Sequence, residues 1–233
     1  MNATPIIYLS VDGATAPADL SRRVMSLEID EHIKKGTGSP HPAAKDIAER
    51  LKGNERLPLL IETPIDGLAL EGGVFNVPFG PEYNLAYQNW NWSTSNMFAI
   101  MPYQVSGMRL NYELGAGWVA RLGVYNGWDQ IVTDNNKGKS PMLSLEWTNP
   151  DDEETYFVLN YMAGNERATD DPRGPWWRHT LDVYAQWHAN ERWSVRGHVF
   201  TGIEPTRSST TEGWFGAALF GKFDANDWFS LAA

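Results

Sequence analysis

Charged and titratable side chains recur at alternate positions of several otherwise apolar segments in the second part of the chain. If the apolar positions between them face lipid, these side chains point into a lumen, where opposed arginines and carboxylates would select ions. Alternatively, they pair with one another and fill a closed interior, as in small barrels. The residues with this spacing are Arg109, Glu113, Arg121, Glu146, Asp182, Arg196 and His198.

Motifs for enzymatic chemistry are absent from the sequence. No nucleophile elbow, phosphate-binding loop, His-Glu-x-x-His motif or dinucleotide-binding glycine pattern occurs. Cysteine is also absent, which excludes disulfide scaffolds and Cys-based zinc sites. We therefore expect no catalytic residue, no cofactor and no enzymatic activity.

Two acidic stretches could be considered for cation binding. Asp129 and Asp134 lie with neighbouring asparagines in one connection, and such oxygen ligands suit Ca²⁺. The same residue types commonly form turns, so this pair is only a weak calcium candidate and we predict no metal site. The acidic run 151–154 is interpreted as a solvated turn that keeps a strand end out of a bilayer.

The segments after residue 66 alternate with a period of two, which predicts β-strands. In the run 118–125, Trp118 and Leu122 fall on one face and Arg121 on the other. Each run is about as long as the 9–11 residues that a tilted strand needs to cross a membrane. Helical periodicity is not found in this part of the sequence.

The predicted connections alternate between short and long. In a meander, alternate connections lie at opposite ends of the sheet, so one end would carry tight turns and the other long loops. Outer-membrane barrels have this asymmetry. The short connections are 115–116, 149–154, 189–191 and 224–227, and the long ones are 76–103, 127–139, 164–177 and 203–212.

Aromatic residues gather near the predicted strand ends. The chain has 11 Trp, 9 Tyr and 9 Phe, and amphipathic rings form girdles at the two interfaces of a membrane barrel. Near the short turns lie Tyr112, Trp118, Trp147, Tyr156, Trp187, Trp193 and Trp228, and near the long loops lie Phe75, Tyr125, Tyr161, Trp177 and Trp214.

Composition narrows the remaining alternatives. The net charge is −10 with no basic run, so a nucleic-acid partner is not expected. No stretch of about 18 apolar residues could form a transmembrane helix. A soluble or secreted β-barrel that binds an apolar ligand would also show alternation, with its apolar face inward. The connection lengths and the tryptophans at strand ends favour the membrane barrel.

Several short motifs resemble a known family, the putative β-barrel porin-2 family of Gram-negative outer-membrane proteins. The resemblance covers roughly residues 60–233. It implies a porin in the cell outer membrane, a passive diffusion channel for small solutes, in contact with membrane lipid and lipopolysaccharide. A homo-oligomer is compatible with it. The motifs are the run 73–82, Asn89–Ser93, Pro102 with Gly107, Val124–Asp129, and Asp134–Asn136 with Lys139.

The expected fold is all-β, an antiparallel up-and-down meander of a transmembrane β-barrel over residues 61–233. About eight complete strands and the start of a ninth are present, so the chain is interpreted as a barrel fragment or a fusion. The long connection 76–103 could fold into the barrel and narrow it.

Residues 1–60 are expected to form a separate, small mixed α/β segment, unrelated to the barrel. Strands are predicted at 6–11 and 24–29 and a helix at 43–51, with no signal peptide visible in the chain. Its opening faintly resembles phage tail hub proteins, which leaves a structural or interaction protein as a further alternative. His32 and His41 are interpreted as solvated loop residues.

Overall fold

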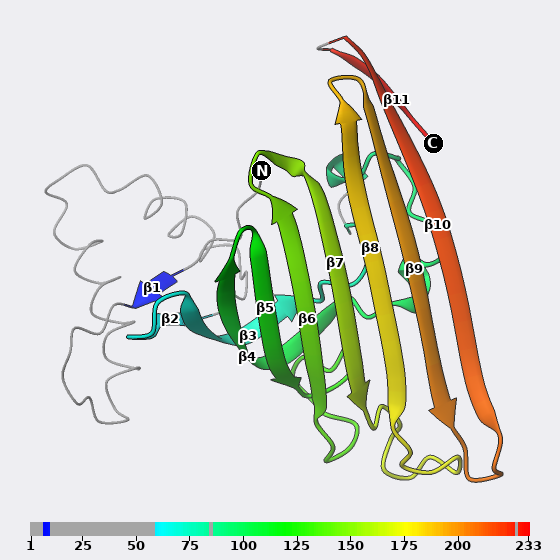
Figure 1. Ribbon diagram of the computed structural model, residues 1–233. Coiled ribbons are helices and arrows are strands. Elements are labelled where there is room, and N and C mark those ends of the chain that lie inside the picture. Colours follow the sequence, from blue (N-terminus) through cyan, green and yellow to red (C-terminus); the bar gives the residue numbers. More distant parts are fainter. Residues whose placement is uncertain (1–6, 10–58, 84–85, 227) are drawn as a thin grey trace, which may run out of the picture.

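A computed structural model of the protein describes residues 7–9, 59–83, 86–226 and 228–233. Eleven strands form one curved sheet in the order of the chain (Figure 1). Two short 3₁₀ helices, η1 (Ala86–Gln88) and η2 (Phe98–Ile100), interrupt the connection between the third and fourth strands. The strands are β1 (Ile7–Leu9), β2 (Leu59–Glu62), β3 (Leu68–Asn76), β4 (Gln104–Gly115), β5 (Trp118–Tyr125), β6 (Ser140–Asn149), β7 (Asp152–Gly164), β8 (Arg178–Asn190), β9 (Trp193–Pro205), β10 (Thr211–Asn226) and β11 (Phe229–Ala232).

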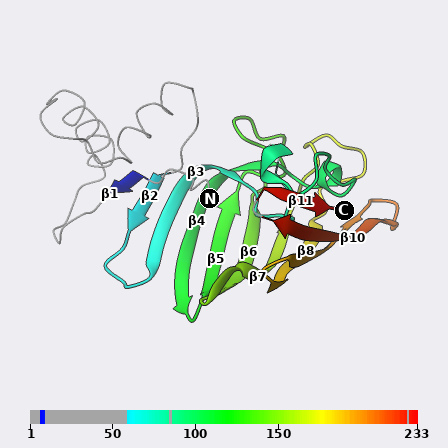
Figure 2. The ribbon, with the colours of Figure 1, turned by 90° about the horizontal axis from the view of Figure 1, so that it is seen from above.

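The predicted all-β meander is confirmed. From β3 to β11 each strand pairs antiparallel with the next, giving eight full strands and the short β11. Among the described strands, only β1 and β2 pair in parallel. The sheet is open, with β1 and β11 at opposite edges, and from above it curves into a trough (Figure 2).

The register separates an apolar, exposed convex face from a concave face that carries the charged side chains together with buried apolar ones. Leu122 of β5 lies opposite Leu110 and Leu143, and all three side chains are exposed on the convex side. One residue earlier, Arg121 lies opposite Ser144, which is 2% exposed. The exposed apolar face is the arrangement of a membrane barrel and the reverse of a soluble one. Among the described residues, no helix is long and apolar enough to span a bilayer.

The turn between β4 and β5 shows why one end of the sheet is tight. Three successive residues, Gly115, Ala116 and Gly117, have positive φ of 84°, 50° and 83°, a conformation that glycine adopts without steric cost. A Cβ on Gly117 would lie 1.9 Å from the Thr148 carbonyl oxygen. Glycine is therefore required where the turn crosses the neighbouring strand.

The opposite end carries the long connections 77–103, 126–139 and 165–177, as predicted. The fourth is shorter than expected, because β9 continues to Pro205 and β10 begins at Thr211. The Thr206 amide donates to the Thr210 carbonyl (2.8 Å), and the hydroxyls of Thr206, Ser208 and Thr210 bond one another. This local network closes the hairpin in a tight loop.

Little of the first 60 residues falls within the described part of the chain. β1 lies inside the strand predicted at 6–11, whereas the strand at 24–29, the helix at 43–51, His32 and His41 lie outside the described residues. The division of the chain at residue 60 stays a prediction.

A charge on the convex face should destabilise the protein only where that face meets lipid. We expect Leu122→Lys to lower the free energy of unfolding in lipid bilayers by about 2–4 kcal/mol, because Leu122 lies near the middle of β5. The measurement is denaturant-induced unfolding in liposomes. The control is Val132→Lys in the exposed connection 126–139, which should change stability by less than about 0.5 kcal/mol. Equal effects of the two lysines would contradict a lipid-facing convex surface.

Candidate functional site

The concave face holds six of the seven charged or titratable residues that the sequence proposes for a lumen. Arg109, Arg121, Glu146, Asp182, Arg196 and His198 lie at concave positions of β4, β5, β6, β8 and β9, and Glu113 lies at the exposed end of β4. Asp182, His198 and Arg196 are buried, whereas Arg121 and Glu146 are partly exposed.

Two of the arginines form ion pairs with carboxylates on adjacent strands. Arg121 pairs with Glu146 on β6, a diagonal neighbour in the register. Arg109 pairs with Glu71, which lies directly opposite on β3. Glu71 was not among the predicted site residues, although it is the partner that the register supplies.

A buried carboxylate joins the sheet to the connection 77–103, hereafter the inner segment. Asp182 accepts hydrogen bonds from His198 Nε2 (2.7 Å), Asn160 Nδ2 (2.9 Å) and the Gly80 amide (3.2 Å). Asn160 Nδ2 also donates to the Pro78 carbonyl (2.5 Å). The side chains of Asp182 and His198 are fully buried, so the inner segment seals this polar group from solvent.

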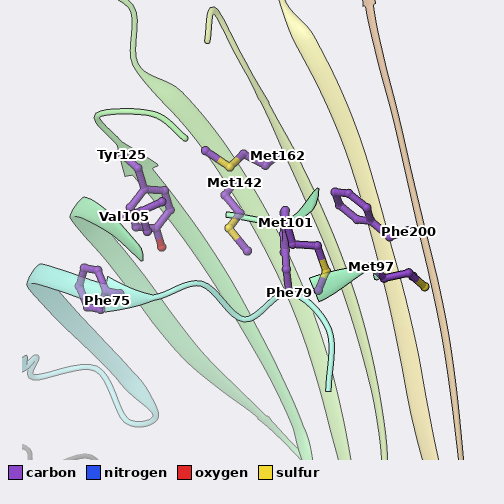
Figure 3. Close-up of a cluster of buried hydrophobic side chains, with 9 residues drawn as sticks. All are labelled: Phe75, Phe79, Met97, Met101, Val105, Tyr125, Met142, Met162 and Phe200. Atoms are coloured by element: carbon purple, nitrogen blue, oxygen red, sulfur yellow. The ribbon is translucent and has the colours of Figure 1, made fainter. Parts of the chain in front are cut away.

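Gly80 allows the inner segment to approach the sheet this closely. Its φ is +67°, and an added Cβ would lie 2.8 Å from Met101 Cε and 2.9 Å from His198 Cε1. Around it the segment contributes Phe79, Met97 and Met101 to an apolar cluster with side chains of the sheet (Figure 3). Phe79 and Phe200 of β9 pack with ring centroids 5.8 Å apart.

Arg196 binds the inner segment at Pro81 and at Trp90. Its Nε and Nη2 donate to Gln186 Oε1 (3.0 and 2.7 Å) and its Nη1 donates to the Pro81 carbonyl (3.2 Å). The guanidinium lies over the ring of Trp90, 4.1 Å from its centroid, a cation–π contact. Figure 2 shows the inner segment on the concave side of the sheet.

A cleft of about 840 Å³ remains between the inner segment and the sheet, toward the short turns. Aromatic and polar side chains line it, and its charged residues comprise two acidic and two basic side chains. The lining residues are Tyr83, Trp90, Gly117, Thr148, Asn149, Pro150, Glu153, Glu154, Tyr156, Gln186, Arg196 and Lys222.

A second charged network lies at the end with the long connections, and sequence reasoning missed it. Arg167 is buried and bonds the Pro205 carbonyl (2.7 Å) beside Glu204 and Glu212. Arg178 donates to Glu204 (3.1 Å) and lies 4.8 Å from the Trp128 ring centroid. Arg167 lies in the connection 165–177, whereas Arg178, Glu204 and Glu212 lie at the ends of β8, β9 and β10. No periodic pattern marks this network, because it joins a loop residue to the ends of three strands.

An exposed ion pair also stiffens the connection 165–177. The Arg173 guanidinium and amide donate hydrogen bonds to Asp171 and lower the pKa of that carboxyl to about 2. A carboxyl with a depressed folded pKa stabilises the folded loop above the ordinary pKa of about 4. That contribution is lost as the pH falls toward 2.

The two candidate calcium ligands have separate partners. Asp129 Oδ1 accepts the amides of Tyr103 (2.6 Å) and Gln104 (3.0 Å), so it anchors the end of the inner segment. Asp134 forms an ion pair with Lys139. Within the described ranges, no three His, Asp or Glu side chains lie close enough together to hold a metal ion.

The aromatic residues differ between the two ends of the sheet. Among those predicted near the short turns, four are exposed: Tyr112, Trp187, Trp193 and Trp228. At the same end, Trp118 and Trp147 pack against each other with ring centroids 6.2 Å apart. Tyr156 instead lines the cleft. Near the long loops, Tyr161 and Trp177 are exposed, but Phe75 and Tyr125 are buried on the concave side and Trp214 packs against the apolar cluster there. The expected girdle at that end is therefore incomplete.

Removal of the central carboxylate should release the inner segment. Asp182→Ala would leave His198 and Asn160 buried without their partner, so we expect a loss of roughly 3–5 kcal/mol in unfolding free energy. We also expect faster hydrogen exchange at the Gly80 amide, because its acceptor is gone. The control is Asp151→Ala in the exposed turn after β6, which should leave both quantities unchanged. An unchanged Gly80 exchange rate in Asp182→Ala would contradict this role.

Comparison with known proteins agrees with this architecture. No curated protein and no solved structure gave a significant match to this chain. The family model described as "putative beta-barrel porin-2, OmpL-like" matches residues 60–233, which include the meander and the inner segment. The chain belongs to this porin-like family of outer-membrane β-barrels.

Proposed function

We propose that the protein is a passive diffusion channel for small solutes in the outer membrane. The observation that carries this proposal is the inversion of the sheet, with the charged side chains on the concave face and exposed apolar side chains on the convex face. A concave polar wall can line a water-filled passage while the convex face meets lipid. Membership of a porin-like family supports the same location and role.

The inner segment is the constriction in this proposal. It leaves the sheet after Asn76 at the end with long connections and contacts Arg196, which lies three residues from the start of β9 at the opposite end. It therefore extends along much of the height of the wall. The buried bonds to Asp182 and Asn160 hold it there in one position, which gives the passage a defined width.

Most of these lumen charges are arranged in pairs, whereas Arg196 is held by Gln186 and the Pro81 carbonyl. Arg109 faces Glu71, Arg121 faces Glu146, and His198 bonds Asp182. Opposite charges held this close largely cancel each other's field at a distance. The channel would consequently discriminate little between cations and anions, and solute width would matter more than solute charge.

The proposed lipid partners lie on the convex face. The tryptophans near the short turns, such as Trp187 and Trp193, are exposed there, and amphipathic rings settle at membrane interfaces. Membrane lipid would surround this face at the end with short turns, and lipopolysaccharide would contact the end with long connections. A monodisperse preparation in the absence of detergent would contradict the membrane location.

Shortening the inner segment should widen the passage. The Ser95 amide donates to Glu82 Oε1 (2.7 Å), which places Ser95 close to the Glu82 side chain. The variant therefore replaces residues 84–94 by two glycines. We expect a higher single-channel conductance of the full-length protein in planar lipid bilayers. Removal of residues 131–133 from the connection 126–139 is the control and should leave the conductance near that of the unmodified protein. A conductance that did not rise on shortening the inner segment would exclude it as the constriction.

Breaking one lumen ion pair should create charge selectivity with a defined sign. Arg121→Gln leaves Glu146 unpaired, so we expect the reversal potential in a salt gradient to shift toward cation selectivity. Glu146→Gln should shift it toward anions, and the double variant should restore the original value. Shifts of the same sign in both single variants would show that these side chains do not face the conduction path.

A further inference from the structure

We propose that the inner segment carries a binding path for neutral polyhydroxylated solutes, namely sugars and small oligosaccharides. This inference rests on the proposed channel function and names its solute class. It follows from three observations: the composition of the inner segment, its unused aromatic side chains, and the cleft beneath it.

The inner segment is uncharged over a long stretch. Between Glu82 and Arg109 the sequence contains no Asp, Glu, Lys, Arg or His. Aromatic residues alternate there with amides and hydroxyls, as in the run Gln88–Ser95. Charged residues make up 21% of the whole chain, so the stretch nearest the proposed passage differs from the rest in its chemistry.

The inner segment has one set of buried side chains and another set of exposed ones. Its buried residues Phe79, Met97 and Met101 hold it on the sheet. By contrast, Tyr83, Tyr87 and Trp92 are 56%, 72% and 89% exposed. These rings take no part in the docking contacts, and they lie on a segment placed on the concave side. Large exposed aromatic side chains in a water-filled passage are available to a passing solute.

The cleft extends this surface with hydrogen-bonding groups. Tyr83 and Trp90 of the inner segment face it together with Tyr156, Gln186 and Arg196 of the sheet. Its volume of about 840 Å³ lies within the range of roughly 300–1,000 Å³ typical of small-molecule sites. Arg196 is held by Gln186, Pro81 and Trp90, so it is a fixed donor rather than a free cation.

These groups match a sugar better than an ion. The face of an aromatic ring is electron-rich and attracts the C–H edge of a pyranose ring, while asparagine and glutamine supply both donors and acceptors for hydroxyls. An anionic solute would meet lumen arginines already paired with Glu71 and Glu146. A cationic solute would likewise meet Glu71 and Glu146 already paired, and in the cleft it would meet Glu153 and Glu154 together with the basic Arg196 and Lys222. The neutral solute is therefore the one that gains contacts along this path.

The test is block of ion current by sugar in the full-length protein. Channels in planar lipid bilayers are titrated with maltotriose, and with glutamate as a charged probe of smaller size. We expect maltotriose to reduce the current in a saturable manner and glutamate to have no saturable effect. Trp92→Ala should weaken the maltotriose block by about tenfold, because one stacking platform is lost. Trp92→Tyr, which keeps a ring, should retain most of it.

The matched control is Trp176→Ala. Trp176 is also an exposed tryptophan, but it lies in the connection 165–177, so the maltotriose block should remain unchanged. Conducting channels without saturable block, or with equal block in Trp92→Ala, would overturn the sugar path and leave the channel function standing. A Trp92→Ala protein with a lower unfolding temperature and an unchanged block would assign Trp92 to packing and overturn the inference. Absence of any conductance would overturn the channel function itself.

Discussion

The structure depends on one buried carboxylate. Asp182 receives hydrogen bonds from two strands and from the inner segment, and so connects the wall to the element that covers it. A buried unpaired carboxylate would be costly, because its lost hydration must be replaced by donors. All three hydrogen bonds to Asp182 must therefore form together. The inner segment is held at the position where the Gly80 amide can donate the third of them.

Both hydrogen bonds and apolar contacts hold the inner segment against the concave face of the sheet. Hydrogen bonds to Asp182 and Asn160 fix its direction, while Phe79 and the methionines bury apolar surface on Phe200. Methionine adapts its shape to irregular gaps, which suits a segment without regular structure. This division leaves the exposed aromatic rings outside the docking contacts, where the proposed passage would meet them.

Charge pairing within the concave face links the fold to its proposed role. Glu71 with Arg109 and Glu146 with Arg121 satisfy one another across neighbouring strands. Isolated charges on such a wall would bind counter-ions, whereas paired charges leave a polar surface with little net field. In the proposed channel the interior would therefore be wet and polar, and solutes would be sorted by width and by contact with aromatic rings.

The sequence by itself determined the strands of the antiparallel meander, their two faces and three of the four long connections, because a period of two is a local property of the chain. It did not predict β2, and the fourth connection is a tight loop. The sequence also held information that the prediction of aromatic girdles did not use. Tyr125 has the same phase of the alternation as Arg121, and it is buried on the same concave side. Only the tertiary structure decided which charges pair, because partners such as Glu71 depend on the register between strands. The docking of Gly80 on Asp182 and the Arg167 network likewise join residues far apart in the chain, and no local pattern encodes such contacts.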